Sequence, residues 1–284
     1  MKRKELGVTM VEIMTVVAII AILVGLLIPA VSMVRRTAKE TQQKVQLTAI
    51  DVGLTAFKND YGDYPPSDTS VGGGLFYCGA QKLAEALVGR DMRGFDPNSK
   101  WDVNDVAYNI QGLGNRRALY LDPDTTHAFR LGAVGNEPGL YEAAKVGRLA
   151  PDTFVLCDVY ARNKVLIPDG TVVKETKLGS PILYYKADPS RKVSGEIYDY
   201  SDNDQFIFLK EVNGEQKSPW GMGAGSQAQA VDNFHRFIRD PRVPLLDLQN
   251  PRSGWPHRPD SYILVTAGAD GIYGTSDDIC NFSR

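Results

Sequence analysis

The chain has 284 residues and a formal net charge of -2, and 43% of its residues are hydrophobic. These values are ordinary for a folded protein of one large domain or two modest ones. The absence of a basic excess argues against a nucleic-acid-binding protein. The three cysteines lie far apart and form no CxxC pair, which argues against zinc or thioredoxin-type chemistry. They are Cys78, Cys157 and Cys280, and the sequence does not determine whether any two of them pair.

The first segment is an apolar run with no charged side chain from Ile13 to Val34. As a helix it is about 33 Å long, at about 1.5 Å per residue, which is enough to cross a bilayer. Lys2, Arg3 and Lys4 precede it, so the positive-inside tendency places the amino terminus in the cytoplasm and the rest of the chain outside. A cleaved signal peptide has a shorter apolar core. A plain signal anchor fits the length but does not explain Glu12, and nothing else in the chain would bury the run as a soluble helix.

Glu12 lies just inside the apolar edge of this run. A carboxylate in lipid costs on the order of 2–3 kcal/mol, so such an acid usually meets a partner. No Lys or Arg lies within the run, so the partner is expected to be another chain or a newly created charge. Cleavage after Gly7 would create one, because the new amino group of Val8 would lie four residues from Glu12.

The stretch KELG followed by VTMVEIMTVVAIIAILVGLLIPAV resembles the class III leader and first helix of type IV pilins and type II secretion pseudopilins. The resemblance implies a leader, residues 1–7, that a prepilin peptidase removes after Gly7, and methylation of Val8. Thr9 and Glu12 then match the second and fifth mature residues. Val8 departs from the phenylalanine that is usual in the family. In such filaments the acid neutralises the amino terminus of a neighbouring subunit, so the resemblance implies that Glu12 directs assembly.

A helical pattern continues beyond the apolar run, with apolar residues at helical spacing and no Gly or Pro until Gly53. One helix is expected from about Thr9 to Lys58, in an N-terminal segment of residues 8–60 whose part 8–34 is the transmembrane and assembly segment. Pro29 matches the helix-loosening proline of the family, and it predicts a kink or local melting because it removes a backbone donor. The amphipathic outer half is expected to pack on its own globular domain. A free coiled coil is the alternative, but no strict heptad persists.

Residues 61–284 are expected to form a periplasmic globular domain. The stretch AFKNDYGDYPP is similar to the segment that follows the first helix in major pseudopilins. The expected fold class is α+β and type IV pilin-like, with the long helix packed on an antiparallel β-sheet. A short helix is expected at Gln81–Val88, a hairpin turn at Pro168–Gly170, and no motif covers residues 67–255. The expected strands are Thr153–Tyr160, Lys164–Ile167, Thr171–Val173, Ile182–Tyr185, Phe206–Leu209 and Tyr262–Thr266.

The last expected strand is followed by TAGADGIYGTSDDI, a glycine-rich stretch with three aspartates: Asp270, Asp277 and Asp278. Glycines let the backbone fold tightly, and calcium takes oxygen ligands from carboxylates, carbonyls and water. The spacing is not that of an EF-hand, which needs a glutamate at its twelfth position. On composition alone, a solvated turn with its acids facing water is an equal alternative.

This stretch is similar to the calcium loop that closes major pseudopilins, which implies a calcium-type loop at residues 266–279. Under the resemblance, Asp270 and Asp277 are side-chain ligands of Ca²⁺ and Asp278 is a third. The carbonyl groups of Ala267 and Thr275 would complete the shell.

No enzyme motif is present, because the histidines show no HExxH spacing and the chain has no GxSxG and no phosphate loop. The pair Asp202 and Asp204 is more typical of a hydrated turn than of catalytic carboxylates, with a second ion site as the alternative.

The resemblance therefore implies a non-enzymatic structural subunit of a type II secretion pseudopilus. It implies a single-pass protein of the bacterial inner membrane that assembles with copies of itself and other pseudopilins into a periplasmic filament. The implied partners are prepilin peptidase, an inner-membrane assembly platform and membrane lipid, and no nucleic acid is expected. One alternative is a type IV pilus subunit used in adhesion, motility or DNA uptake. Another is a membrane-anchored binding module that never polymerises. The sequence does not distinguish a major from a minor subunit or identify what is exported.

Overall fold

The computed structural model describes residues 9–103, 116–117, 119–122, 125–132, 139–141, 146–160, 163–169, 172–191, 194–209, 220, 226–247 and 250–282. The chain divides into two compact units, Met1–Gln42 and Gln43–Arg284. The first long helix begins in the first unit and ends in the second.

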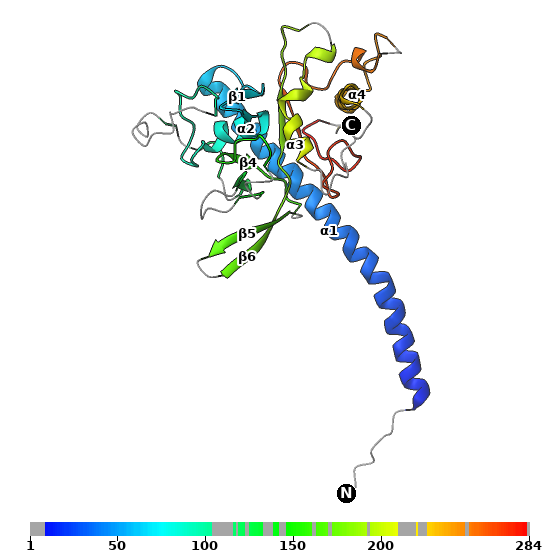
Figure 1. The fold of residues 1–284 in the computed structure, drawn as a ribbon. Coiled ribbons are helices and arrows are strands. Elements are labelled where there is room, and N and C mark those ends of the chain that lie inside the picture. Colours follow the sequence, from blue (N-terminus) through cyan, green and yellow to red (C-terminus); the bar gives the residue numbers. More distant parts are fainter. Residues whose placement is uncertain are drawn as a thin grey trace. The chain divides into compact units, whose positions relative to one another are not determined.

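Helix α1 (Met10–Tyr61) has 52 residues and is the blue helix of Figure 1. It confirms the helix that the sequence predicts from about Thr9 to Lys58. The helix ends at Gly62, whose φ of 87° and N–H bond to the Lys58 carbonyl are typical of a glycine that closes a helix. It is helical without a break through Pro29. Of the predicted kink or local melting, the melting is therefore wrong and the kink stays a prediction. A proline removes one backbone bond, and the bonds on either side of it keep this helix continuous.

The strands pair as antiparallel two-stranded ladders, β1–β2, β3–β4, β5–β6 and β7–β8. Together with α1 they confirm the α+β, type IV pilin-like fold. The predicted single sheet is divided, however, and isolated bridges such as Cys157 with Pro181 continue the pairing beyond the ladders. Pro181 has no N–H to extend a regular ladder, which accounts for the break there. The strands are β1 (Ser70–Gly72), β2 (Leu75–Tyr77), β3 (Ala128–Arg130), β4 (Phe154–Leu156), β5 (Asn163–Asp169), β6 (Val172–Leu178), β7 (Leu183–Lys186) and β8 (Tyr262–Val265).

The register of the β5–β6 hairpin corrects the predicted turn. Pro168 pairs with Val173 and Asp169 pairs with Val172, so Pro168 and Asp169 belong to β5 rather than to a turn. The connection is residues 170–171, which lie outside the described residues. A proline is tolerated in such a strand where its missing donor faces away from the ladder.

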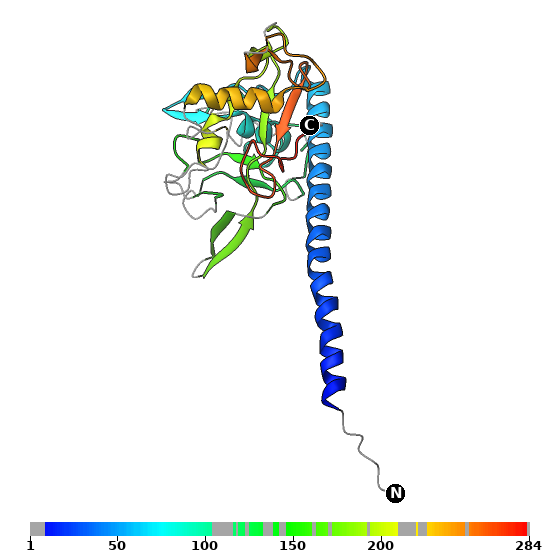
Figure 2. The same ribbon diagram turned by 90° about the vertical axis from the view of Figure 1, so that its right-hand side faces the viewer.

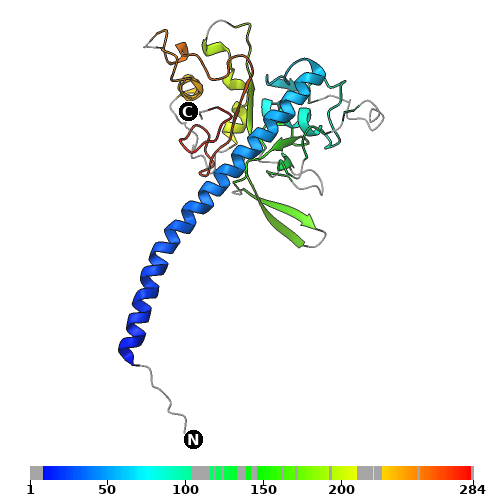
Figure 3. The same ribbon diagram turned by 180° about the vertical axis from the view of Figure 1, so that it is seen from behind.

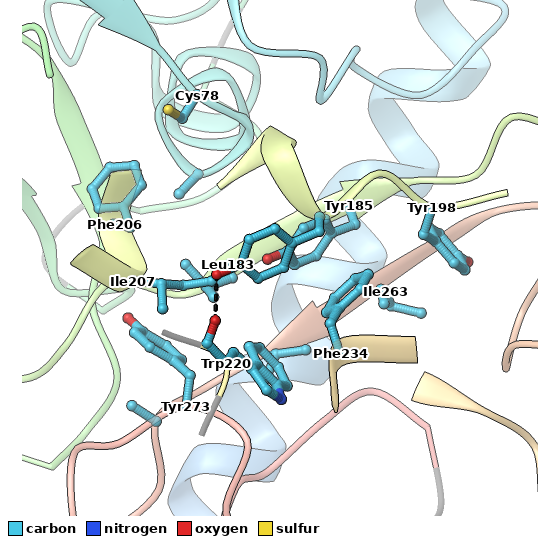
Figure 4. Close-up of a cluster of buried hydrophobic side chains, with 14 of the residues drawn as sticks. Cys78, Leu183, Tyr185, Tyr198, Phe206, Ile207, Trp220, Phe234, Ile263 and Tyr273 are labelled. Atoms are coloured by element: carbon cyan, nitrogen blue, oxygen red, sulfur yellow. Dashed lines mark hydrogen bonds between the residues drawn. The ribbon is translucent and has the colours of Figure 1, made fainter. Parts of the chain in front are cut away.

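The pair β7–β8 is buried on both faces, and its side chains alternate between two apolar clusters. Tyr184 and Leu264 belong to the cluster that includes α1 and α2. Tyr185 belongs to the second cluster, where Phe234 and Trp220 pack together with their ring centroids 5.4 Å apart. Figure 4 shows this second cluster. A strand alternates its side chains with period two, so one ladder joins the two halves of the core.

The shorter helices include one confirmed prediction and one correction. Helix α2 (Gly79–Val88) confirms the helix expected at Gln81–Val88. The strand expected at Phe206–Leu209 is instead helix α3 (Asp204–Phe208), because a short apolar run does not distinguish the two by itself. Helix α4 (Gln227–Ile238) was not predicted. The described residues also form the 3₁₀ turns η4 (Ser194–Glu196), η5 (Tyr200–Asp202) and η7 (Pro251–Ser253).

Buried polar side chains hold the second part of α1 to the rest of its unit. The amide nitrogen of Gln46 donates to the carbonyls of Thr126 and Cys157, each at 2.9 Å. Further along, the hydroxyl of Tyr262 donates to Asp51 at 2.7 Å. In Figure 2, β8 runs alongside this part of the helix, and Figure 3 shows the helix between the chain carrying α2 and the carboxyl-terminal chain. The two bonds of Gln46 are buried and the bond between Tyr262 and Asp51 is partly buried, so they define which turns of α1 belong to the globular unit.

Candidate functional site

The beginning of α1 is closed by a reciprocal pair of side chains. The hydroxyl and the amide of Thr9 both donate to Glu12 Oε2 at 3.0 Å, and the Glu12 amide donates to the Thr9 hydroxyl at 3.2 Å. This is a capping box, which satisfies backbone donors at the start of a helix. These partners are neutral, so within the described residues no positive charge compensates the negative charge of Glu12. The predicted processing residues Gly7 and Val8 lie outside the described residues.

The apolar part of α1 presents its side chains outward. Large apolar residues from Met10 to Val34 are exposed, and Leu26 is 69% exposed. Within the described residues, α1 is the helix that is long and apolar enough to cross a membrane. A helix that is apolar all round is stable only in a membrane or within a larger apolar assembly. This part of α1 therefore requires lipid or other apolar surfaces around it.

The carboxyl-terminal loop brings the three predicted aspartates together. One carboxylate oxygen from each of Asp270, Asp277 and Asp278 lies within 4.8 Å of the others. In the sequence a glycine-containing turn separates Asp270 from the other two aspartates. The fold of the loop brings the three carboxylates together. Three acids at this spacing repel one another unless a cation or protons lie among them.

Hydrogen bonds orient all three carboxylates, and that of Asp270 accepts from the Ile272 amide at 2.8 Å. Asp277 Oδ2 accepts from the backbone N–H groups of Ala269 at 2.6 Å and Asp270 at 3.0 Å. The Thr275 hydroxyl is 2.6 Å from Asp277 Oδ1 and 3.1 Å from Asp278 Oδ1. Burial raises the pKa of Asp277, but the bonds from Thr275 and the two amides outweigh it and lower the pKa overall. The carboxylate is therefore held in the charged form, which is the form that binds a metal ion.

The backbone of the loop is closed at its base and tightly turned. The Thr266 amide donates to the Ile279 carbonyl at 3.1 Å, and the Thr266 hydroxyl donates to the same carbonyl at 3.0 Å. Gly268 and Gly274 have φ of 52° and 91°, a region that side chains other than glycine rarely adopt. A Cβ at Gly274 would collide with the indole of Trp220. The glycines are therefore required for the loop to fold against the core.

The donor set fits a hard cation such as calcium, because every candidate atom is an oxygen. The predicted Ala267 carbonyl accepts from the Gly271 amide at 2.9 Å, and a carbonyl has a second lone pair for a further partner. The Thr275 hydroxyl lies against the carboxylates of Asp277 and Asp278, and the role of the Thr275 carbonyl stays a prediction.

The pair Asp202 and Asp204 differs from the predicted hydrated turn. Asp202 is only 6% exposed and accepts a hydrogen bond from the Ser67 hydroxyl. Burial raises its pKa to about 7. Asp204 is partly buried, and burial raises its pKa as well. The residue types gave no sign of this burial, because it depends on how η5 packs against the chain before β1.

Two curated proteins are similar to this chain, and both are described as type II secretion system core protein G. The one from Pseudomonas aeruginosa is 31% identical over 151 residues, which cover 51% of this chain and 96% of that protein. The one from Vibrio cholerae is 26% identical over 153 residues, which cover 51% of this chain and 92% of that protein. No protein-family model matches the chain, and no solved structure matches it. About half of the chain therefore has no counterpart in these relatives.

Proposed function

This chain belongs to the family of type II secretion system core protein G, the major pseudopilins, and we propose that it is a structural subunit whose polymerisation drives protein export. In this proposal the subunit is stored in the bacterial inner membrane, with its amino terminus in the cytoplasm and residues 61–284 in the periplasm. It then assembles with copies of itself and other pseudopilins into a periplasmic filament. A structural role needs no catalytic residue, and we assign none.

Processing is the first proposed step. Prepilin peptidase cuts after Gly7 and methylates the new amino group of Val8. The cut places a positive charge directly before Thr9, at the start of α1, where the helix dipole and the free N–H groups disfavour a cation. That charge is therefore more stable beside a carboxylate than alone.

The observation that carries the proposal is the charge of Glu12, which has no cationic partner among the described residues, on an exposed apolar helix. Thr9 satisfies hydrogen bonds at this carboxylate but supplies no positive charge. When apolar helices pack side by side, the surroundings lose water and an unpaired charge becomes costly. The amino group of Val8 in a neighbouring copy would remove that cost. The pairing would set the axial position of each subunit, with the inner-membrane assembly platform as the proposed site of addition.

The capping role and the charge-pairing role of Glu12 can be separated by two substitutions. Glutamine at this position still completes a capping box, whereas alanine does not. If charge pairing directs assembly, Glu12→Gln and Glu12→Ala should both lower filament yield by about tenfold or more, since close charge pairs couple by about 1.5 kcal/mol or more. Cleavage after Gly7 should continue in both variants. Normal filaments in Glu12→Gln would mean that Glu12 only caps the helix.

We also propose that the loop of residues 266–279 binds Ca²⁺. Asp270, Asp277 and Asp278 would supply carboxylate oxygens, with the Ala267 carbonyl and the Thr275 main-chain carbonyl as further candidates. The ion would supply positive charge that relieves the repulsion among the three acids. The oxygen-only donor set within 4.8 Å supports this assignment. Bound calcium would couple the loop to β8 through the bonds between Thr266 and Ile279.

A type IV pilus subunit is the second function considered. The relatives are both described as type II secretion proteins, so they do not favour it.

A further inference from the structure

A polar cavity of ≈ 740 Å³ lies in the second unit, bounded by the end of β7, the chain carrying η4 and η5, and α4. Carboxylates dominate its wall, and three cations accompany them. The proposed functions of α1 and of the carboxyl-terminal loop use none of these residues. The balance of their charges indicates what the cavity can bind.

Each cation of the wall already has an acidic partner, so the cavity is not suited to an anion. These ion pairs are Lys186 with Asp63 at 2.6 Å, Arg191 with Asp188 at 3.2 Å and Glu196 at 3.3 Å, and Arg252 with Asp232 at 2.7 Å.

Three further carboxylates of the wall belong to Asp199, Asp202 and Asp260, and none of them has an ion pair within the part of the chain that the structure describes. Asp199 begins η5, where its carboxylate accepts from the backbone N–H of Ser201 at 2.9 Å. Asp199 and Asp260 are exposed at the surface, and Asp202 lies deeper. Asp199 and Asp260 therefore leave an unbalanced negative charge at the rim of the cavity. Asp202 adds only part of a charge further in near pH 7, because burial raises its pKa to about 7.

His235 is a second and independent sign of a ligand. Its side chain is 6% exposed and lines the cavity from α4. Neither ring nitrogen of His235 has a hydrogen bond to any of the residues that the structure describes. Burial, followed by the charge of Arg252, lowers the pKa of His235 to about 4. The imidazole is therefore neutral near pH 7 and has a lone pair that can accept from a cationic donor.

The chain itself carries a matching cationic segment. Between Arg35 and Lys44 there are four basic residues and one acid, Glu40. All four basic side chains are exposed, and Arg36 pairs with Glu40 at 2.9 Å. A guanidinium group offers five N–H donors in a planar fork, which suits a wall of carboxylates and one neutral imidazole.

We propose that this cavity in one copy binds the basic segment Arg35–Lys44 of a neighbouring copy. The inference rests on the proposed assembly of copies into a filament. This contact would be the second one between subunits, after the charge pair at Glu12. It would join the globular unit of one subunit to the helix of another. Complementary charge across such a contact favours one register and disfavours others.

A cross-linking experiment in the full-length chain tests the contact. One copy carries Arg36→Cys and a second, co-expressed copy carries Gln227→Cys, at an exposed residue of the cavity wall. The matched control replaces Gln227→Cys by Gln229→Cys, which is exposed on the same helix but does not line the cavity. We expect a disulfide between copies with Gln227→Cys, and about tenfold less with the control or when each cysteine variant is expressed alone.

A charge-removal series tests the chemistry of the same contact. Asp199→Asn with Asp260→Asn keeps an N-cap residue at η5 and removes two charges, and we expect about tenfold less cross-link. Asp152→Asn, an exposed acid outside the cavity, should leave the yield unchanged. Filaments that form without the cross-link, or a cross-link that is indifferent to Asp199 and Asp260, would overturn this inference alone. Failure of the parent chain to form filaments would overturn it together with the proposed function. Cross-linking of the cavity to another protein in place of Arg36 would also overturn it.

Discussion

Asp277→Asn is the sharpest perturbation of the carboxyl-terminal loop. An asparagine keeps one oxygen to accept from the amides of Ala269 and Asp270, now 2.6 and 3.0 Å from the carboxylate. Its NH₂ group can donate to the Thr275 hydroxyl, which rotates to accept. The cost to the calcium-free protein should therefore be limited to about 1 kcal/mol, the net value of one hydrogen bond. One of the three charges that a calcium ion would neutralise is removed.

The effect of calcium on stability follows from its affinity. Extracellular calcium modules bind with Kd of about 10⁻⁴–10⁻³ M. At about 10 mM free calcium this stabilises the folded state by about 1.4–2.7 kcal/mol. For a unit of this size the corresponding rise in Tm is about 3–10 °C. In Asp277→Asn we expect a rise of less than about 1 °C, because fewer ligand charges weaken the site.

The assay is thermal unfolding of the full-length chain in detergent, followed by near-ultraviolet circular dichroism with calcium and with a chelator. Asp260→Asn is the control, since it removes an exposed acid outside the loop and should keep the full rise. A parent chain whose Tm is the same in calcium and in chelator would refute the calcium assignment. An equal rise in parent and Asp277→Asn would show that calcium binds elsewhere.

Three further predictions concern the core. Gly274→Ala should lower stability by about 1–3 kcal/mol and shift the fluorescence of Trp220, because the new Cβ meets the indole. The control is Gly62→Ala, where φ is similar but a new Cβ would have no atom within 4 Å, and it should cost only about 1 kcal/mol. The pKa of Asp202 is raised to about 7 in the folded state, so the folded state binds more protons than the unfolded state between about pH 4 and 7. The stability of the fold should therefore fall as the pH rises through that window. Asp202→Asn should therefore be more stable than the parent chain at pH 8 and equal to it at pH 4, and identical denaturant curves at pH 8 would contradict this. Gln46→Leu should lose about 1–3 kcal/mol in urea unfolding, since it removes two buried hydrogen bonds, and an unchanged midpoint would show that the amide is not needed.

Helix α1 was predictable because its signal is long. The apolar run and the helical spacing after it cover more than ten turns, and such strongly periodic segments are the most reliable elements to predict. Helix α4 also has a signal that could have been used. Ser226 precedes it as an N-cap, and Ala230, Phe234 and Phe237 follow at helical spacing. Helix α3 is different, because five residues rich in apolar side chains fit a strand equally well.

The candidate sites also differ in whether the sequence could predict them. The aspartates of the carboxyl-terminal loop are close in sequence and lie among glycines, so their spacing predicted that the carboxylates come close together. The cavity beside His235 gathers residues from β7, η5 and α4, which are far apart in the chain. The burial of Asp202 likewise depends on Ser67, which lies before β1. Such long-range encounters depend on tertiary packing and leave no short-range pattern.

Assembly by charge pairing requires the newly exposed amino group that Glu12 is proposed to meet. Intact-mass analysis of the native polypeptide, extracted from membranes and from filaments, tests this directly. We expect a chain that begins at Val8 with a methylated amino group in both fractions. A native chain that still begins at Met1 in assembled filaments would contradict it.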